Sequence, residues 1–345
     1  MRKNVLLADC APEEVESLVD SLNASIYSEN TKFQIESRIS NWKRTGAFSE
    51  LRRYGTYFAV GFGCFLKRHS YQRIIGWQQF HALIFCFFCS IFNVKKSTTV
   101  IALNYTYKEK QGKAAGLYRW FMERCVDPRY LDYIHVLSDT YADLIAGEFR
   151  FPKERIIVTG FGVNDCYAEF SQMPAPKNYQ KDGYALAIGR SNRDYDFLIR
   201  AWEGIDYPLV IISDTYTGHA QSENIVILRN VAGEESYPWI ANCGLMVIPI
   251  DDASVCSGDT VLLTAMASKR KIIVTAPSTL AEMYVADGKN AVLVPKKIDA
   301  FREIVNDVLK SEDYADLGEG ARNSFLKNYS RQSMGEKIAK RLLCE

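Results

Sequence analysis

The stretch SGDTVLLTAMASKRKIIVT, residues 257–275, combines a polar turn, an apolar-faced helix and a strand in immediate succession. The helix is predicted to begin at this turn, so its unpaired backbone N–H groups and the positive end of its dipole meet the hydroxyls of Ser257 and Thr260. That combination is typical of an anion site. Upstream, GLMVIPI at 244–250 is a short apolar run, as expected for a parallel strand covered on both faces. The turn therefore lies at a strand's carboxyl end, where open α/β sheets bind ligands.

Taken alone, this stretch favours a simpler interpretation, one βαβ unit with a well-capped helix, so its neighbours matter. The segment GRSNR at 189–193 is also a turn directly after an apolar strand, and it carries two guanidinium groups whose planar forks match diphosphate oxygens. Glu282 adds a polar side chain near the end of the next strand. We therefore expect a phosphate or diphosphate site formed by Gly189, Arg190, Arg193, Ser257, Gly258, Asp259, Thr260 and Glu282.

Apolar strands and helices alternate along the whole chain, with one polar interruption. That interruption, SQMPAPKNYQKDG at 171–183, holds two prolines and many polar residues, which indicates a linker. The pattern predicts an α/β protein with two Rossmann-like doubly wound domains. Strands are expected at 4–8, 73–77, 98–103, 133–138 and from 155 before the linker, and at 184–189, 208–213, 224–228, 244–250, the end of 257–275 and 291–295 after it.

The domain boundaries follow from this pattern. We place the first, acceptor-side domain at 1–167, the linker at 168–183 and the nucleotide-binding domain at 184–324. Residues 325–345 are amphipathic, and we expect a helix that packs back toward the first domain. Two such domains facing each other across a cleft suit a transfer between two bound substrates.

The composition argues against several classes of function. The 345 residues carry a net charge of +1 and no RNA- or DNA-binding signature, so we expect no nucleic-acid partner. Nine cysteines at irregular spacing do not form a disulfide framework and indicate a reducing compartment. Cys86 and Cys89 form a lone CxxC pair without a second pair or a histidine cluster, so we predict no structural metal and no cofactor.

Two apolar segments bear on location. The start, MRKNVLLADC, has too short an apolar core for a signal peptide. The run ALIFCFFCSIF at 82–92 is about half of the roughly 20 residues that a spanning helix needs. We therefore expect a cytoplasmic protein in which 82–92 is a buried helix.

A basic and aromatic segment spans residues 38–73. It holds eight basic side chains against a single acid, Glu50. Such a segment could rest on an anionic membrane at its inner face or contact a phosphorylated lipid. Scattered charges on a solvated surface are an equally good interpretation. The basic residues are Arg38, Lys43, Arg44, Arg52, Arg53, Lys67, Arg68 and Arg73. They are interleaved with the aromatic residues Trp42, Phe48, Tyr54, Tyr57, Phe58, Phe62 and Phe65.

Polar side chains also follow the predicted strands of the first domain. Asp9 follows the opening strand, Asn104 and Tyr105 follow the strand at 98–103, and Ser138 ends a later one. In a doubly wound sheet these strand ends share one edge. We therefore assign Asn104, Tyr105 and Ser138 to the acceptor side.

Several segments, in order and across most of the chain, resemble the GT-B-fold glycosyltransferases, close to family 4 (glycosyltransferases group 1) of the type that builds bacterial surface polysaccharide. AIGRSNRDYDFLIRAW (187–202) is similar to the family's Gly-Arg turn and its helix, LLTAMASKRKIIVT (262–275) to its helix and strand over the donor site, and IIVTGFGVND (156–165) to the end of its first domain. The resemblance implies a metal-independent hexosyltransferase that uses a nucleotide-diphosphate sugar and a glycan or lipid-linked oligosaccharide acceptor. It puts Arg190 and Arg193 on the diphosphate, with catalytic roles.

The sequence departs from the family in one respect. The family has two glutamates that bracket the donor turn, and the matching positions of this chain hold Cys256 and Thr264. Thr264 thus stands where the family has a glutamate that contacts the ribose, which leaves the stereochemical course open. An inverting enzyme would need a general base in the first domain, and Asp9, His69 and His81 are the candidates. Asp9 could instead cap the following helix, and His81 could be an ordinary core histidine.

Two other functions remain compatible with these residues. A chain that lost the glutamate pair could be an inactive scaffold subunit of a transferase complex. A sugar-nucleotide epimerase of the same fold would share the diphosphate site but need no acceptor.

Overall fold

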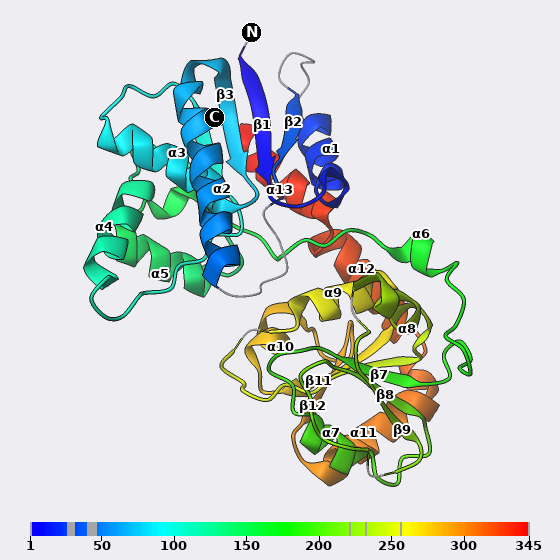
Figure 1. Ribbon diagram of the computed structural model, residues 1–345. Helices are drawn as coiled ribbons and strands as arrows, with labels where there is room; N and C mark the ends of the chain where they lie inside the picture. Colours follow the sequence, from blue (N-terminus) through cyan, green and yellow to red (C-terminus); the bar gives the residue numbers. More distant parts are fainter. Residues whose placement is uncertain are drawn as a thin grey trace. The chain divides into compact units, whose positions relative to one another are not determined.

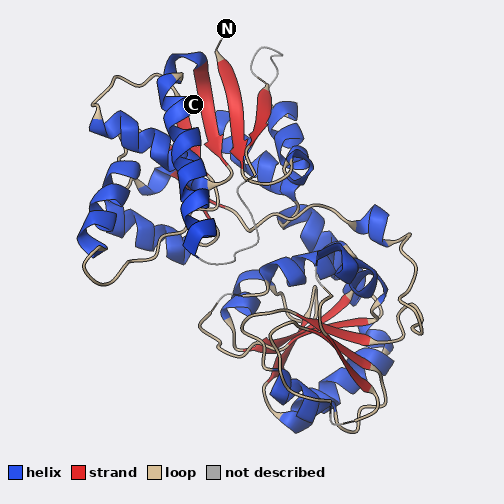
Figure 2. Cartoon of the chain, in the orientation of Figure 1, coloured by secondary structure: helices blue, strands red, loops and turns tan. Residues whose placement is uncertain are grey.

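The computed structural model describes residues 2–25, 32–39, 47–220, 222–231, 233–255 and 257–343. Contacts divide the chain into two compact units. Unit 1 comprises Met1–Asn164 and Arg331–Glu345, and unit 2 comprises Asp165–Ser330 (Figure 1). Within the described residues, each unit holds one six-stranded sheet with helices packed around it (Figure 2).

The sheet of unit 1 is parallel throughout, in the order β2-β1-β3-β4-β5-β6. Alternate residues of β1 enter two different cores: Val5 and Leu7 join one and Leu6 joins the other, all at most 1% exposed. Both faces are thus covered, which explains the short apolar strands. The elements are β1 (Lys3–Ala8), η1 (Pro12–Glu14), α1 (Glu16–Ala24), β2 (Phe33–Ser37), α2 (Ala47–Leu66), η3 (Arg68–Ser70), β3 (Tyr71–Gly76), α3 (Gln79–Ile91), β4 (Thr99–Ala102), α4 (Ala115–Cys125), β5 (Tyr133–Val136), α5 (Asp139–Phe149), η4 (Lys153–Arg155) and β6 (Ile156–Val158).

The last helix of the chain, α13 (Arg331–Leu343), belongs to unit 1. Its apolar residues Met334 and Ile338 pack with Leu18 and Leu22 of α1 in one core. The two helices touch so closely that a Cβ atom on Gly335 would come within 2.7 Å of the Leu18 carbonyl oxygen. The first and the last helices of the chain therefore belong to the same unit and share one core.

The sheet of unit 2 is also parallel, in the order β12-β11-β10-β7-β8-β9. Trp202 is fully buried on one side of it and packs against Phe301 of α11. The elements are α6 (Tyr167–Phe170), β7 (Ala185–Ile188), α7 (Tyr195–Trp202), β8 (Leu209–Ile212), β9 (Ile225–Leu228), η5 (Gly233–Ser236), α8 (Tyr237–Asn242), β10 (Leu245–Ile248), α9 (Asp259–Ala267), β11 (Lys271–Ala276), α10 (Thr279–Tyr284), β12 (Val292–Pro295), α11 (Ile298–Lys310), η6 (Glu312–Tyr314) and α12 (Leu317–Asn328).

Each sheet has a point where the strand order reverses. In unit 1 the first strand, β1, lies between β2 and β3, and in unit 2 the first strand, β7, lies between β8 and β10. At such a switch point the loops after two neighbouring strands diverge and leave a crevice at the carboxyl edge. The crevices are therefore expected between the loops after β1 and β3, and between the loops after β7 and β10.

Most of the apolar run at 82–92 lies buried in α3, as predicted, but Ile91 and Phe92 at its end are 39% and 59% exposed. No helix in the described ranges has both the length and the apolar character needed to span a bilayer. Of the twelve strands in the described residues, β2 has no counterpart among the strands expected from the sequence.

Candidate functional site

Unit 2 brings two of the predicted turns together at its switch point. β7 ends at Ile188 and leads into the turn at 189–193, and the neighbouring β10 ends at Ile248 and leads into the loop at 249–258. Arg193 and Ile250 form an isolated antiparallel bridge between the two loops. The two turns that the sequence assigns to the diphosphate therefore meet at the edge where open sheets bind ligands.

Asn192 holds the two loops in register. Its side-chain nitrogen donates to the carbonyl oxygens of Asp252 (3.0 Å) and Val255 (3.1 Å), and its Oδ1 accepts from the backbone N–H of Asp252 (2.7 Å). The residue has a left-handed φ of 55°, which asparagine tolerates better than most residues do. The sequence did not point to Asn192, although it lies between two residues that it did assign.

Arg193 lies between the backbones of two glycines. Its Nη1 donates to the carbonyl oxygens of Ser191 (3.1 Å) and, at longer range, Ser257 (3.5 Å). A Cβ atom on Gly189 would come within 2.9 Å of its Nε, and one on Gly258 within 2.4 Å of its Nη2. The Nε atom is buried without a hydrogen-bond partner among the described residues, and burial lowers the pKa of the guanidinium. This cation is therefore positioned by the fold but not fully bonded within it.

The amino end of α9 lies against this guanidinium. The helix begins at Asp259, and its N-cap residue Gly258 has a left-handed φ of 103° and provides no side-chain cap. The predicted helix start is confirmed. The backbone N–H of Thr260 lies 3.0 Å from Oδ1 of Asp259, and Ser257 Oγ donates to the Ser191 carbonyl oxygen (3.3 Å). A helix dipole and an arginine thus present positive charge to the same point.

The remaining donor-side residues are more exposed. Arg190 is exposed on the 189–193 turn, and its carbonyl oxygen accepts a hydrogen bond from Thr215 Oγ1 (2.7 Å). Glu282 is exposed in the first turn of α10, which follows β11. Thr264 is half-buried in the middle of α9. Cys256, the other position where the family has a glutamate, lies outside the described residues.

At the switch point of unit 1, Asp9 follows β1 and Gln78 follows β3. Oδ2 of Asp9 accepts hydrogen bonds from Tyr57 Oη (3.2 Å) and Gln78 Nε2 (3.4 Å), and Gln78 Nε2 lies 3.1 Å from Tyr57 Oη. These bonds direct the carboxylate toward α2 and the loop after β3, not toward a cap of the following helix. A half-buried carboxylate held by uncharged donors at this edge can accept a proton or orient a hydroxyl.

The two histidine candidates are placed less favourably than Asp9. His81 is fully buried in α3, with its ring 5.4 Å from that of Tyr57. Burial lowers its pKa, while the nearby charge of Asp9 acts in the opposite direction. His69 is exposed in η3, which precedes β3 and so lies at the opposite edge of the sheet from Asp9. Of the three, Asp9 combines the carboxyl edge with partial exposure.

Of the residues assigned to the acceptor side, Tyr105 is corrected by the structure. It is 1% exposed within the core of unit 1, and burial raises the pKa of its phenol well above the usual range, so its ring does not reach a substrate. Ser138 is the N-cap of α5 and accepts from the backbone N–H of Tyr141 (3.2 Å). Asn104 has a left-handed φ of 51° and donates its backbone N–H to His135 Nδ1 (3.1 Å). Acceptor contacts by Ser138 and Asn104 stay predictions.

Arg331 at the start of α13 is a site residue that sequence reasoning missed. Its guanidinium stacks on Trp77, 4.6 Å from the ring centroid, and the residue is 9% exposed. Within the described residues its Nε and Nη1 have no hydrogen-bond partner, and burial lowers its pKa, partly offset by Cys10 and Glu14. Because Trp77 and Cys10 follow β3 and β1, this cation lies at the same edge as Asp9.

Comparison with known proteins gives a consistent picture. Residues 183–311 match the family Glycosyl transferases group 1. Similar solved structures include a glycosyltransferase from Rickettsia africae (13% identity, TM-score 0.63, 99% of each chain covered). Others are HepE from Anabaena in complex with UDP and glucose (12%, 0.62, 100% of each) and the lipopolysaccharide outer core galactosyltransferase WaaB (15%, 0.60, 99% of each). No curated protein matched the sequence.

Identities this low establish the fold and leave the substrates to be argued from the site. Both parallel sheets and nearly the full length of the chain align with two-domain GT-B structures, so the predicted fold class is confirmed. The family match falls on the unit that holds Arg193 and the start of α9. The chain is therefore a GT-B-fold protein, and residues 183–311 of its second unit match the family Glycosyl transferases group 1.

Proposed function

We propose that the protein transfers a sugar, in the simplest case a hexose, from a nucleotide-diphosphate donor to a glycan or lipid-linked oligosaccharide. The observation that carries the proposal is the position of Arg193, whose guanidinium lies at the start of α9 with a buried Nε that has no partner among the described residues. A buried donor without a partner is costly unless a ligand supplies the acceptor. A diphosphate offers both the oxygens and the negative charge.

The chemistry of the transfer fits these groups. As the bond between the anomeric carbon and the diphosphate oxygen breaks, its electron pair stays on the leaving diphosphate. Arg193, Arg190 from the same turn and the amino end of α9 oppose that growing charge. Fixed positive charge of this kind takes the part that a divalent cation plays in other transferases, so the proposed reaction is metal-independent.

The acceptor hydroxyl must lose its proton as its oxygen bonds to the anomeric carbon. In an inverting reaction we assign that proton to Asp9, which lies at the carboxyl edge of unit 1 and accepts hydrogen bonds from the uncharged groups of Tyr57 and Gln78. In a retaining reaction the acceptor attacks from the face that the diphosphate leaves, so the departing diphosphate oxygen would take the proton and Asp9 would orient the acceptor. Arg331 provides a cation at the same edge for an anionic group of the acceptor.

The names of the similar structures support the choice of substrates. HepE was solved with UDP and glucose, and WaaB is a lipopolysaccharide outer core galactosyltransferase. We accordingly propose a UDP-sugar donor, a role in surface-polysaccharide synthesis and a place on the cytoplasmic side of the cell membrane. The acceptor would be a growing glycan, free or linked to a lipid.

An inactive GT-B subunit is the second candidate, and Thr264 is the residue that favours it. It stands in α9 where the family resemblance expects a glutamate on the ribose, and a threonine hydroxyl is too short to replace that contact. A scaffold of this kind would keep the fold of unit 2 without needing to bind a donor. Retained donor binding therefore separates the two candidates.

Calorimetry with UDP, GDP and dTDP tests the donor site directly. Binding of at least one of them supports the transferase, and binding of none supports the scaffold. Arg193→Ala should lower turnover by about two or more orders of magnitude, the loss expected for one transition-state contact, and Arg190→Ala should act in the same direction. Arg200→Ala is the matched control, because it removes an exposed guanidinium from α7 of the same unit.

Incubation with the sugar nucleotide alone separates a transferase from an epimerase. A transferase leaves the donor unchanged or releases free sugar and nucleotide slowly, whereas an epimerase yields an isomeric sugar nucleotide without any acceptor. Unchanged turnover in both Arg190→Ala and Arg193→Ala would contradict the assignment of the diphosphate site.

A further inference from the structure

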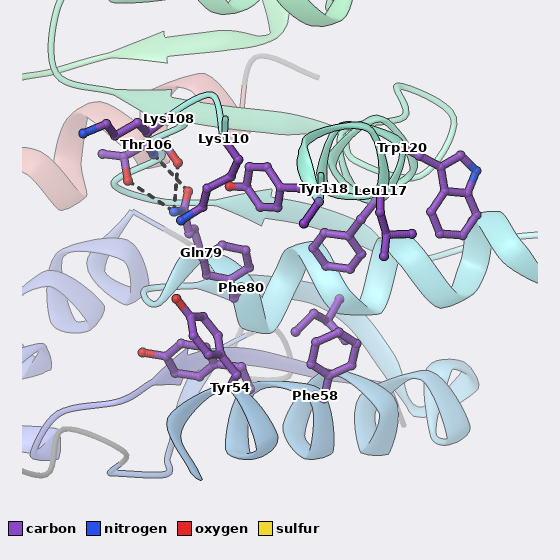
Figure 3. Close-up of a pocket in the computed structure, with 14 residues that line it drawn as sticks. Tyr54, Phe58, Gln79, Phe80, Thr106, Lys108, Lys110, Leu117, Tyr118 and Trp120 are labelled. Atoms are coloured by element: carbon purple, nitrogen blue, oxygen red, sulfur yellow. Dashed lines mark hydrogen bonds between the residues drawn. The ribbon is translucent and has the colours of Figure 1, made fainter. Parts of the chain in front are cut away.

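Unit 1 contains a pocket of about 690 Å³ between α2, α3 and α4 (Figure 3). Its walls are largely aromatic and apolar: Tyr54 and Phe58 come from α2, Phe80 from α3, and Leu117, Tyr118 and Trp120 from α4. Figure 3 shows Tyr54 and Phe58 of α2 on one side of this space and Leu117 and Tyr118 of α4 on the other, with Trp120 at its outer edge. A volume of this size is in the range of small-molecule sites.

The walls of this pocket remain open to solvent to an unusual degree for large apolar residues. Leu117 is 70% exposed, Trp120 and Tyr54 are 42% exposed, and Phe58 is 40% exposed. These residues form one concave surface and not scattered positions, and a contiguous apolar surface of this kind usually marks a binding site.

One end of the pocket is polar and positively charged. Lys108 and Lys110 line it, and Lys110 Nζ lies 5.7 Å from the centroid of the Tyr118 ring. Gln79 is fixed there by Thr106, since it donates to the Thr106 carbonyl oxygen (3.0 Å) and accepts from the Thr106 backbone N–H (2.9 Å). Among the described residues that line the pocket there is no carboxylate. An anion is therefore the complementary group for this end.

The pocket also adjoins the proposed catalytic edge of unit 1. Tyr57 lines the pocket, and its hydroxyl donates to Oδ2 of Asp9 (3.2 Å). Gln79, which also lines it, follows directly on Gln78, the second partner of Asp9. A molecule in the pocket would thus have its polar end near Asp9 and its apolar part along α2 and α4.

We propose that this pocket binds the head-proximal part of a lipid phosphate acceptor, with an isoprenoid or similar apolar chain along the aromatic walls and the phosphate at Lys108 and Lys110. The inference rests on the proposed function and narrows its acceptor to the lipid-linked class. A water-soluble glycan would leave the aromatic walls unfilled.

Binding of isoprenyl monophosphates of increasing length tests the proposal without any reaction. Dimethylallyl, geranyl, farnesyl and geranylgeranyl phosphate are titrated by calorimetry below their aggregation concentrations, with inorganic phosphate and farnesol as partial ligands. Each methylene that leaves water should raise affinity roughly fourfold until the pocket is full, so affinity should climb steeply along the series and then level off. Farnesol should bind more weakly than farnesyl phosphate, and inorganic phosphate much more weakly than either.

Variants assign the two parts of the ligand to the two parts of the pocket. Phe58→Asp and Leu117→Asp should each lower the affinity for farnesyl phosphate at least about tenfold, since each puts a charge in the apolar wall. Leu144→Asp is the matched control, because Leu144 is 53% exposed on α5 of the same unit and does not line the pocket. The double variant Lys108→Glu with Lys110→Glu should lower the affinity for farnesyl phosphate but not the affinity for farnesol. Its control is Lys113→Glu, on the same loop but outside the pocket lining, which should change neither affinity.

The outcomes separate this proposal from its rivals and from the proposed function. The proposed lipid phosphate site would be wrong if farnesyl phosphate did not bind, or if the wall and lysine variants left its binding unchanged. Binding only to anionic vesicles would also contradict it and would indicate a membrane surface contact. A dimer in sedimentation that Leu117→Asp dissociates would contradict it as well, because the pocket would then be an interface between two copies. Because Lys108 and Lys110 are exposed, their double variant keeps the test valid if a wall variant fails to fold. UDP binding, measured on the same samples, reports on the donor site independently.

Discussion

Arg193 and Gly258 lie so close together that a Cβ atom on residue 258 would come within 2.4 Å of Nη2 of the arginine. Gly189 stands on the other side, where a Cβ atom would come within 2.9 Å of Nε. Both glycines also have positive φ values, 103° and 151°. The position of the guanidinium is thus set by two residues without side chains, one from each loop at the switch point.

Gly258→Ala should displace Arg193 and weaken donor binding about tenfold or more, because the added methyl group occupies the place of the guanidinium. The left-handed backbone alone costs about 1–2 kcal/mol for a residue with a Cβ. Gly288→Ala controls for that cost, since Gly288 has a φ of 68° but no atom within 4 Å of an added Cβ. UDP calorimetry on both variants checks the prediction, and equal affinities would contradict it.

The strands of unit 2 could be predicted closely because parallel strands that are covered on both faces are continuous apolar runs. The expected strand at 184–189 is observed as Ala185–Ile188, and that at 208–213 as Leu209–Ile212. β2 escaped prediction for the complementary reason. It is an edge strand whose residues alternate between buried and exposed, and its sequence FQIES is too short and polar to be told from a loop.

The parts of the diphosphate site that are adjacent in sequence could be predicted. The contacts between residues that are distant in sequence could not. Gly189 and Arg193 share one turn, so their chemistry could be read directly. Asn192 joins that turn to carbonyl groups 60 and 63 positions later, and nothing local indicates such a link. Tyr105 shows the reverse error: it follows a strand as predicted, yet its ring packs into the core against Phe149 of α5.

Asp9→Asn should lower turnover by about two orders of magnitude or more and leave UDP affinity unchanged, if Asp9 takes the acceptor proton. The substitution keeps an oxygen that can accept from Tyr57, so the local hydrogen bonds survive in part. Turnover and UDP calorimetry are measured on the same preparation. Loss of UDP binding in this variant would show a wider disturbance, and full turnover would remove Asp9 from the mechanism.

Arg331→Met should reduce activity with a lipid-linked acceptor while leaving the free energy of unfolding unchanged or higher. Arg331 is a buried cation whose Nε and Nη1 have no hydrogen-bond partner within the described residues, and its burial costs desolvation that methionine avoids. Methionine replaces the cation–π contact with Trp77 by an apolar contact of its thioether with the ring. The checks are acceptor KM and urea unfolding. A large loss of stability would instead make Arg331 a structural residue.

Acidification should destabilise unit 1 through His135. Its Nδ1 accepts from the Asn104 backbone N–H (3.1 Å) and its Nε2 lies 2.7 Å from Thr159 Oγ1, which in turn donates to the Gly160 carbonyl oxygen (3.0 Å). This arrangement fits the neutral ring, and burial lowers the pKa of His135 from 6.5 to about 3. Between those values the unfolded chain binds a proton that the folded chain does not, so stability falls as the pH falls below 6.5.

The expected size is about 1.4 kcal/mol per pH unit, or about 2 kcal/mol at about pH 5. His135→Gln should lower stability at neutral pH but show a shallower loss on acidification, because it removes the titrating ring. Urea unfolding of both proteins at a series of pH values measures the two slopes. Equal slopes would contradict the prediction. His81, whose pKa burial also lowers, contributes in the same direction in both proteins.

The basic segment at 38–73 is distributed over the end of β2, α2 and β3 and does not form one element. Within it, Lys43, Arg44 and Trp42 lie outside the described residues. Arg53 and Arg68 pack on aromatic rings, with their guanidinium carbons 5.2 Å and 5.0 Å from the centroids of the Tyr54 and Phe65 rings. Changing these two arginines would disturb packing as well as charge, so they are unsuitable for a test of membrane binding.

Arg52→Glu combined with Lys67→Glu should weaken attachment to anionic vesicles, because both residues are exposed on or next to α2 beside Leu51 and Leu66, which are 69% and 59% exposed. Each basic contact near an anionic leaflet is worth about 1 kcal/mol, and reversing a charge removes the attraction and adds repulsion. Flotation with anionic and neutral vesicles measures the effect, with Arg200→Glu and Lys310→Glu of unit 2 as a control of equal charge change. Attachment of the unmodified protein should decline as salt screens the charges, while apolar insertion persists. A protein that ignores anionic vesicles even at low salt would refute the membrane contact and leave the diphosphate site at Arg193 unaffected.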